Sequence, residues 1–295
     1  MSTSTVGTIG YRSTTRVSFG QLRAIWAIAR SNIRVIFRYW FFWVLIAIAM
    51  LHFLITFALI YLKSQMAVSD ELGFASALID QIQVTGSGRA YMEFLLRQTE
   101  GVYITLAYAS AVLLATDFQA GGINFYLSKP IGRVQYLLGK LIALFVVVGI
   151  QTLVPALALF AEAALYAENF TYVSDHTHIL IGIFAYSAII MIVPSVLGLA
   201  IAVTFRKTAP IIVVWIGFLF IIPAFGALLR AVFDNGNWMM LGLRYDLRVL
   251  GGALFSIISP AGEMRLPYVL IIIVAVSVLS VALVIRQLRP VEVVQ

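Results

Sequence analysis

Long apolar runs constrain this 295-residue chain more than any other feature of its sequence. A helix needs about 20 apolar residues, at 1.5 Å each, to cross the roughly 30 Å hydrocarbon core of a bilayer. Five runs meet this requirement: residues 39–62, 141–165, 179–205, 210–229 and 267–285. A sixth run, 101–116, is shorter, but a helix that enters from Tyr91 would complete it. The sequence therefore predicts an all-α polytopic membrane protein with six transmembrane helices.

The composition excludes several classes of protein. Hydrophobic residues make up 62% of the chain and charged residues 11%, which is far too apolar for a soluble domain. The chain has no cysteine, so disulfides, thiolate metal sites and a cysteine nucleophile are all excluded. Three histidines leave little material for a metalloenzyme.

The positions of lysine and arginine predict the orientation in the membrane, because basic residues concentrate on the cytoplasmic side. With the N-terminus inside, the cytoplasmic segments hold 13 of the 20 basic residues: Arg12, Arg16, Arg23, Arg30, Arg34, Arg38, Lys129, Arg133, Lys140, Arg206, Lys207, Arg286 and Arg289. Only two acids, Asp117 and Glu292, accompany them. Both termini are therefore expected in the cytoplasm. The net charge of +7 serves topology and contact with anionic lipid, so nucleic-acid binding has no support.

The segment 16–38 predicts a basic amphipathic helix that lies in the membrane interface. Its arginines follow one stripe of a helix: Arg16, Arg23, Arg30, Arg34 and Arg38. The apolar Leu22, Trp26, Ile33 and Phe37 fall elsewhere on the helix. Two roles remain open for the anchor residues Arg23, Arg30, Arg34 and Arg38. The helix is either a topological anchor alone or an anchor that also docks a cytoplasmic protein.

The two terminal tails, the transmembrane domain and the last outer loop can be assigned in the same way. Residues 1–15 are Ser/Thr-rich and are expected to be disordered; no apolar region follows closely enough for a signal peptide. Residues 39–289 form the predicted transmembrane domain, and 290–295 form a C-terminal tail. Within the last outer loop, Val249–Ile258 is too short to span. It is expected either as a helix at the outer surface or as a buried loop helix.

Catalytic motifs are missing. The sequence contains neither H-E-x-x-H nor G-x-S-x-G. The stretch Gly132–Lys140 resembles a phosphate loop only faintly, because Leu141 stands where serine or threonine must follow the lysine. His176 and His178 make a weak metal pair in an acidic loop, so solvated histidines are the simpler interpretation. We therefore predict no catalytic, cofactor-binding or metal-ligating residue.

Polar residues within the spans are few. His52, Thr56 and Gln151 are candidates for a polar pathway, although His52 fits an interhelical hydrogen bond better than a proton carrier. Glu162 lies near the outer end of its span, which suggests an interfacial carboxylate. Three prolines within spans are expected to kink their helices: Pro155, Pro194 and Pro223.

The polar insert between the second and third spans carries the most specific pattern, 115-ATDFQAGGINFYLSKPIGRVQYLLGK-140. It resembles the permease subunit of type 2 ABC exporters, whose members show E-x-x-x-G-T, then L-x-x-P-[IV]-[ST]-R, then G-K. The matching residues are Asp117, Gly121, Leu127, Pro130, Ile131, Arg133, Gly139 and Lys140. Two positions depart from the pattern, since Asp117 replaces glutamate and Gly122 replaces threonine.

The resemblance implies a short coupling helix within 117–133 that sits in a groove of a separate cytoplasmic ATP-binding subunit. The residues that it assigns to this coupling are Asp117, Gly121, Leu127, Pro130, Arg133 and Lys140. Lys129, Arg133 and Lys140 are expected to face lipid phosphates or carboxylates of the partner. The resemblance further implies two ATPase copies, a second permease chain (identical or related), and the cytoplasmic membrane of a bacterium or archaeon. The chain itself would be no enzyme.

The sequence leaves two other function classes open to comparison. A membrane scaffold or assembly factor without a transport pathway is favoured by the shortage of polar residues within the spans. An intramembrane enzyme is disfavoured because the sequence supplies no nucleophile–base pair. For a transporter, the apolar interior favours an amphipathic or lipid-like cargo that enters from the bilayer.

Overall fold

The computed structural model describes residues 20–66, 87–119, 132–167 and 172–287. These residues are helical apart from short connections, and no strand occurs among them. Six helical stretches are long and apolar enough to cross a membrane, here called spans 1 to 6: Trp40–Leu62, Gly88–Gln119, Arg133–Tyr166, Thr177–Phe205, Thr208–Phe233 and Pro260–Gln287. The predicted all-α, six-helix membrane fold is confirmed. The cytoplasmic placement of the two termini stays a prediction.

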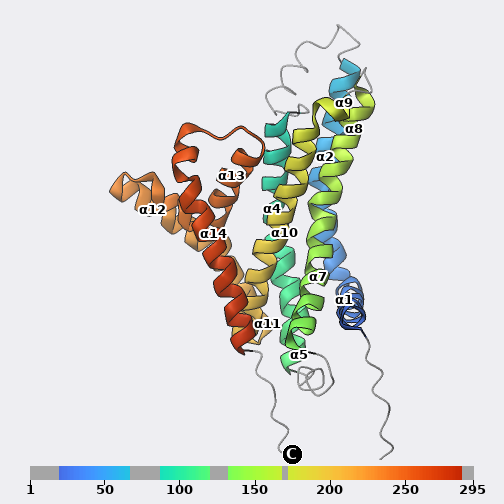
Figure 1. Ribbon diagram of the computed structural model, residues 1–295, viewed down its shortest axis with the longest axis vertical. Coiled ribbons are helices and arrows are strands. Elements are labelled where there is room, and N and C mark those ends of the chain that lie inside the picture. Colours follow the sequence, from blue (N-terminus) through green and yellow to red (C-terminus); the bar gives the residue numbers. More distant parts are fainter. Residues whose placement is uncertain (1–19, 67–86, 120–131, 168–171, 288–295) are drawn as a thin grey trace, which may run out of the picture.

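The helices are named as in Figure 1. Their bounds are α1 Gln21–Phe37, α2 Trp40–Met66, α4 Gly88–Ser110, the π-helical turn η2 Ala111–Ala115, α5 Thr116–Gln119, α7 Arg133–Gln151, α8 Leu153–Tyr166, α9 Tyr172–Asp175, α10 Thr177–Phe205, α11 Thr208–Ile216, the π-helical turn η3 Gly217–Ile221, α12 Ile222–Phe233, the 3-10 helix η4 Gly236–Leu241, α13 Leu243–Leu254 and α14 Pro260–Gln287.

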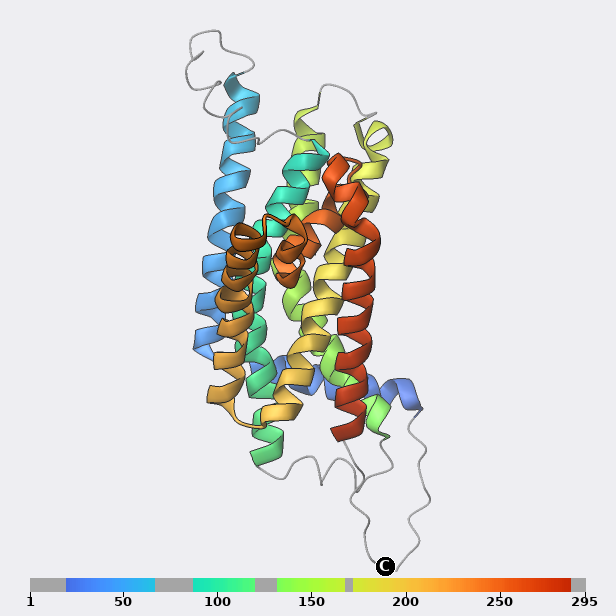
Figure 2. The same ribbon diagram turned by 90° about the vertical axis from the view of Figure 1, so that its left-hand side faces the viewer.

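Four long rods, α2, α4, α7–α8 and α10, run side by side, and α14 packs along α10 (Figure 1). The short α1 lies crosswise at the lower end of this bundle, where it packs against α7 (Figure 2). Burial is unequal among the spans. Two thirds of the most apolar window of spans 2 and 4 is buried, whereas span 1 is only 11% buried and span 5 only 17%. Spans 1 and 5 therefore present apolar surfaces that lipid or another protein must cover.

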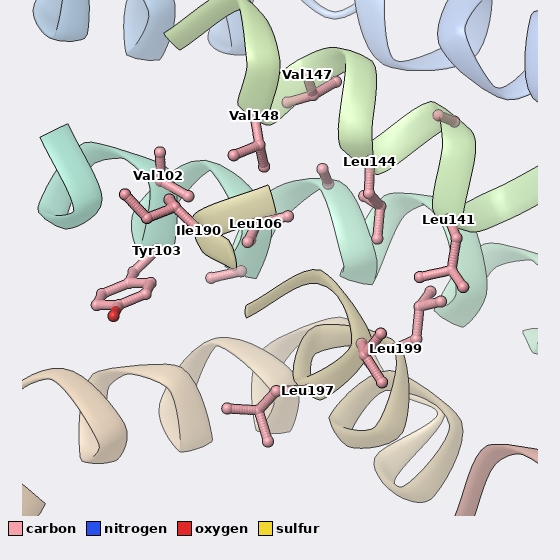
Figure 3. Close-up of a cluster of buried hydrophobic side chains, with 14 of the residues drawn as sticks. Val102, Tyr103, Leu106, Leu141, Leu144, Val147, Val148, Ile190, Leu197 and Leu199 are labelled. Atoms are coloured by element: carbon pink, nitrogen blue, oxygen red, sulfur yellow. The ribbon is translucent and has the colours of Figure 1, made fainter. Parts of the chain in front are cut away.

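Three helices supply the centre of the core (Figure 3). Its labelled side chains are Val102, Tyr103 and Leu106 from α4, Leu141, Leu144, Val147 and Val148 from α7, and Ile190, Leu197 and Leu199 from α10. Most of them are completely shielded from solvent. Since lipid tails are as apolar as leucine, such contacts stabilise the bundle by close packing rather than by exclusion of water.

The second span extends well beyond the apolar run 101–116, in agreement with a helix that enters from the side of Tyr91. It begins at Gly88, where the hydroxyl of Ser87 accepts the backbone N–H of Ala90 and caps the helix. The apolar count missed the outer half because Glu93 and Glu100 interrupt it. Those carboxylates are paired within the protein, as described below, so they do not break the span.

Two of the three prolines that were expected to kink a helix lie next to an irregularity of that helix. Span 3 is interrupted between Gln151 and Leu153, because Pro155 has no N–H to donate to the carbonyl of Gln151. In span 5, Pro223 follows the π-helical turn η3, and beyond it α12 leads away from α10 (Figure 1). Helix α10 instead continues through Pro194 without interruption.

The helix expected at residues 249–258 lies earlier in the chain. Helix α13 begins at Leu243 and ends at Leu254, with Ser256 in the left-handed region at φ 57° just beyond it. It packs on α4, α10 and α14 and buries Leu247 and Leu250, so it is a packed helix rather than one lying free on the surface. The sequence-based bounds were wrong because apolar residues alone defined them.

Candidate functional site

A buried lysine marks the junction where the polar insert joins the membrane domain. Lys140, two turns into α7, is only 2% exposed. Burying an ammonium group costs several kcal/mol unless each of its N–H groups finds an acceptor. The residues around Lys140 must therefore supply an acceptor for each N–H of its ammonium group.

The ammonium of Lys140 has three acceptors, one for each N–H. Its Nζ lies 2.7 Å from Oδ2 of Asp117, 2.7 Å from Oδ1 of Asn32 and 2.7 Å from the carbonyl oxygen of Leu113. These partners come from α5, α1 and η2, so one side chain joins three elements that are distant in the sequence. We call Lys140, Asp117, Asn32, Leu113 and Tyr136 the lysine junction.

The acceptors of the lysine junction are themselves held in place. The hydroxyl of Tyr136 donates to Oδ2 of Asp117 at 2.8 Å, and Nδ2 of Asn32 donates to the carbonyl of Ile28 at 2.7 Å. Asp117 keeps 21% of its side chain exposed, which makes it the solvent-facing edge of an otherwise buried network. Both ends of the insert, at Asp117 and at the start of α7, are thereby fixed to each other.

The π-helical turn η2 explains why a main-chain carbonyl is available to Lys140. A π-helical turn contains one residue more than an α-helical turn, so a carbonyl loses its usual α-helical donor there. Side chains serve two consecutive carbonyls in this turn: Lys140 donates to Leu113, and the hydroxyl of Thr116 donates to Val112. The irregular backbone of span 2 and the buried lysine of span 3 thus stabilise each other.

Gly139 allows α1 to approach α7 closely beside the lysine junction. A Cβ at this position would lie 2.6 Å from Cγ2 and 2.7 Å from Cβ of Ile28, and 3.1 Å from the carbonyl oxygen of Ile25. No rotamer change of Ile28 would remove the contact with its Cβ. Both residues of the G-K motif therefore contact α1. Gly139 allows the close approach of the two helices, and Lys140 donates a hydrogen bond to Asn32.

Helix α1 shows three faces. Its buried face, which includes Ile28 and Asn32, packs against α7. Leu22 and Trp26 form a second face and are 81% and 59% exposed. The arginines of the predicted anchor are exposed beside that face: Arg23, Arg30, Arg34 and Arg38. An apolar edge flanked by arginines suits a membrane interface, and the interfacial role stays a prediction.

The remaining coupling residues have different positions. Gly121, Leu127 and Pro130 lie outside the described residues, as does Lys129. Arg133, the first residue of α7, is partly exposed and forms no hydrogen bond or ion pair with any described residue. The expectation that Lys140 faces lipid phosphates or a partner was wrong, because its ammonium points into the lysine junction.

The three candidates for a polar pathway do not converge. The ring of His52 stacks on Phe94 at 5.1 Å, and Thr56 donates to the backbone carbonyl of His52. Gln151 is fully buried, and its Nε2 donates to Oγ1 of Thr105 at 2.9 Å. Gln151 therefore joins spans 2 and 3.

Replacing Gln151 with leucine should lower the free energy of unfolding by about 0.5–1.5 kcal/mol, because the buried hydroxyl of Thr105 loses its partner. Unfolding of the purified protein in mixed micelles measures this change. Thr105→Val alone is the matched control, and the double variant should lose less than the sum of the two. A fully additive result would contradict the pairing.

The outer residues Glu162, His176 and His178 have separate surroundings. Glu162 is 4% exposed, and neither of its carboxylate oxygens has a hydrogen-bond partner, so its side chain is buried within the protein near the outer end of span 3. His176 stacks on Tyr172 at 4.2 Å and lies 6.4 Å from the ring of His178. In the described part of the chain, no three His, Cys, Asp or Glu side chains come together in a way that could hold a metal ion.

Comparison with known families gives a match that spans the lysine junction. A family model described as ABC-2 family transporter protein covers residues 26–237, from α1 through span 5. The chain belongs to the ABC-2 transporter family. No curated protein matches it. ABC-2 permeases are generally non-catalytic and depend on a partner ATP-binding subunit. The resemblance first carried by the insert is thus confirmed over most of this ABC-2 permease.

Sequence reasoning missed three members of the lysine junction. Asn32, Tyr136 and the carbonyl of Leu113 have no place in the family motif that the insert resembles. One signal was available for Asn32, since it is a lone polar residue on the apolar face of α1 between Ile28 and Ile36. A carbonyl freed by a π-helical turn leaves no sequence signal.

Proposed function

We propose that this ABC-2 permease is the membrane half of an exporter, and that a separate cytoplasmic ATPase drives it by moving the insert 117–133. The observation that carries the proposal is the lysine junction. It links the end of span 2, the start of span 3 and the crosswise helix α1 through one buried ammonium. A displacement of the insert would therefore reach all three elements together.

Arg133 is the side chain at this end of α7 that we assign to direct contact with the ATPase. It is partly exposed and has no intrachain partner among the described residues, in contrast to Lys140. A guanidinium in this state can form a bidentate ion pair with a carboxylate of another subunit. In this proposal the lysine junction positions the insert, and Arg133 contributes to binding.

The exposed apolar surfaces support a second permease chain. Spans 1 and 5 bury few of their residues within this chain, in contrast to spans 2 and 4. A pair of chains that meet along such spans would enclose a pathway between them, and the cytoplasmic membrane is the expected location. The cargo would then be amphipathic or lipid-like, since the spans facing that pathway are apolar.

The test uses affinity-tagged full-length permease purified from its native membranes in mild detergent. Any ATP hydrolysis in the sample comes from a partner, because this chain has no phosphate loop. Arg133→Ala should lower the co-purifying ATPase activity about tenfold, as loss of an interfacial charge pair does. Arg286→Ala, the same change at an exposed position of α14, is the matched control.

Two outcomes would count against the proposal. Equal activity in the two arginine variants would remove Arg133 from the contact. An absence of any co-purifying ATPase would favour a membrane scaffold, which is the second candidate. That candidate is supported by Gln151 and Thr105, whose polar groups satisfy each other inside the bundle instead of lining a path.

A further inference from the structure

Helix α13, at the outer side of the bundle in the predicted orientation, is fitted closely onto α4 and α10. A Cβ at Gly251 would lie 2.8 Å from Cγ of Met92 and 2.9 Å from Cζ of Tyr186. Just beyond the helix, the ring of Phe255 packs against Gly182, where a Cβ would approach it to 2.8 Å. Glycines thus create the space in which α13 and its flanking phenylalanine are docked.

Two ion pairs hold the exposed edge of α13 to α4. Nη2 of Arg244 lies 3.1 Å from Oε1 of Glu100, and Nη2 of Arg248 lies 3.4 Å from Oε2 of Glu93. All four side chains are at least partly exposed, so each pair alone contributes little to stability. Their importance here is that both nearby arginines already have acidic partners.

Asp246 lies between these arginines in the sequence but on the opposite side of α13. Its side chain is 1% exposed, and its Oδ1 has no hydrogen-bond partner. The groups that titrate or carry charge on the surrounding elements are Arg89, Tyr91, Glu93, Arg97, Glu100, Tyr103 and Tyr108 of α4, His178 and Tyr186 of α10, Glu263, Arg265, Tyr268 and Arg286 of α14, and Arg244, Tyr245 and Arg248 of α13 itself; η4 has none. None of them donates a hydrogen bond to Oδ1 of Asp246, and none of the described cations forms an ion pair with it.

Polar side chains of α10 and α14 that pack near α13 have partners of their own. Arg265 donates to the hydroxyl of Tyr245 at 2.6 Å and to Oδ1 of Asn237 at 3.2 Å. The hydroxyl of Tyr186 donates to the carbonyl of Leu247 at 3.0 Å. A carboxylate at Asp246 would therefore be buried without a cation, which proteins avoid by keeping the group protonated.

We propose that Asp246 is a proton-binding site, and that the bound proton holds α13 in its docked position on α4 and α10. The neutral carboxyl is compatible with the closed packing around Gly251, whereas the carboxylate needs water or a cation. Water can reach it only if α13 moves away from α4 and α10. Loss of the proton would therefore release α13.

The direction of the pH dependence follows from burial, which raises the pKa of Asp246 from 3.8 to about 8 in the docked state. Once α13 is released and the group is hydrated, its pKa returns toward 3.8. The docked state then binds more protons than the released state between these two values. Docking is strongest at low pH, weakens as the pH rises toward 8, and changes no further above that.

The experiment exploits the absence of cysteine from the chain. Val249 of α13, which is buried against α10 and α14, is replaced by cysteine. The rate at which a maleimide modifies this cysteine reports the release of α13. Ser31→Cys on the exposed side of α1 corrects for the ionisation of the thiol itself. Both are measured on the full-length protein in detergent from pH 5 to 9.5.

The corrected rate of Val249→Cys should rise with pH by up to about tenfold per unit and level off near pH 8. Adding Asp246→Asn, which mimics the protonated group, should abolish that rise. A rise that persists with asparagine would overturn the proposal. If the asparagine variant does not fold, the protein with Val249→Cys alone still tests the proposal. A corrected modification rate that does not change with pH would exclude proton binding at Asp246.

Discussion

Replacing Lys140 with methionine is expected to lower the free energy of unfolding by about 3–5 kcal/mol, as removal of one member of a buried ion pair does. Methionine fills the space, but it leaves Oδ1 of Asn32 and the carbonyl of Leu113 without a donor. It also leaves the carboxylate of Asp117 with only the hydroxyl of Tyr136 as a partner. Unfolding of the purified permease in mixed micelles measures the loss.

The matched controls separate the ion pair from simple packing. Asp117→Asn alone keeps an acceptor for Tyr136 and should cost less than Lys140→Met. The double variant should cost less than the sum of the two single variants by about 0.5–3 kcal/mol, the range expected for residues in direct contact. Additive losses would show that the 2.7 Å contact between Lys140 and Asp117 carries no energetic coupling.

The proposed function adds a second measurement to the same variants. If the lysine junction positions the insert, Lys140→Met should lower ATPase co-purification together with stability. Arg133→Ala should lower co-purification alone, because Arg133 forms no hydrogen bond or ion pair with a described residue whose loss would destabilise the fold. A scaffold that binds no ATPase would show no change in co-purification with either variant.

The spans were predictable because the bilayer imposes length and apolarity on each helix separately. Prediction failed where a charged residue is paired in the folded protein with a residue far away in the chain. Glu93 and Glu100 shorten the apolar run of span 2 to residues 101–116, yet both are paired with arginines of α13. No local pattern connects residues so far apart in the chain.

Lys140 shows the same limit at the candidate site. The positive-inside rule explains a lysine at a membrane end by topology and therefore places it at the surface. Its burial depends on Asn32, Leu113 and Asp117 meeting at one point, which only the packing of α1 against α7 achieves. The burial of Asp246 likewise depends on the packing of α13 against α4 and α10, which no local pattern in the sequence indicates.

Gly139→Ala is expected to displace α1 from α7, with a loss of about 1–3 kcal/mol from overpacking. The added methyl group would lie 2.7 Å from Cβ of Ile28 and 3.1 Å from the carbonyl oxygen of Ile25. Both atoms belong to or adjoin the backbone of α1, so the whole helix has to move. That movement separates Asn32 from Lys140, which lies next to Gly139.

Gly149→Ala provides the matched control on the same helix, because a Cβ there meets only the sulfur of Met191, at 3.4 Å. Alanine is the better helix former by about 1 kcal/mol, so this variant should be neutral or slightly stabilised. A spin label at Ser31 of α1 then reports the position of that helix. Its distance to a label on α10 should change with Gly139→Ala and not with Gly149→Ala. Identical distances in both variants would mean that Gly139 is not what sets the approach of α1 to α7.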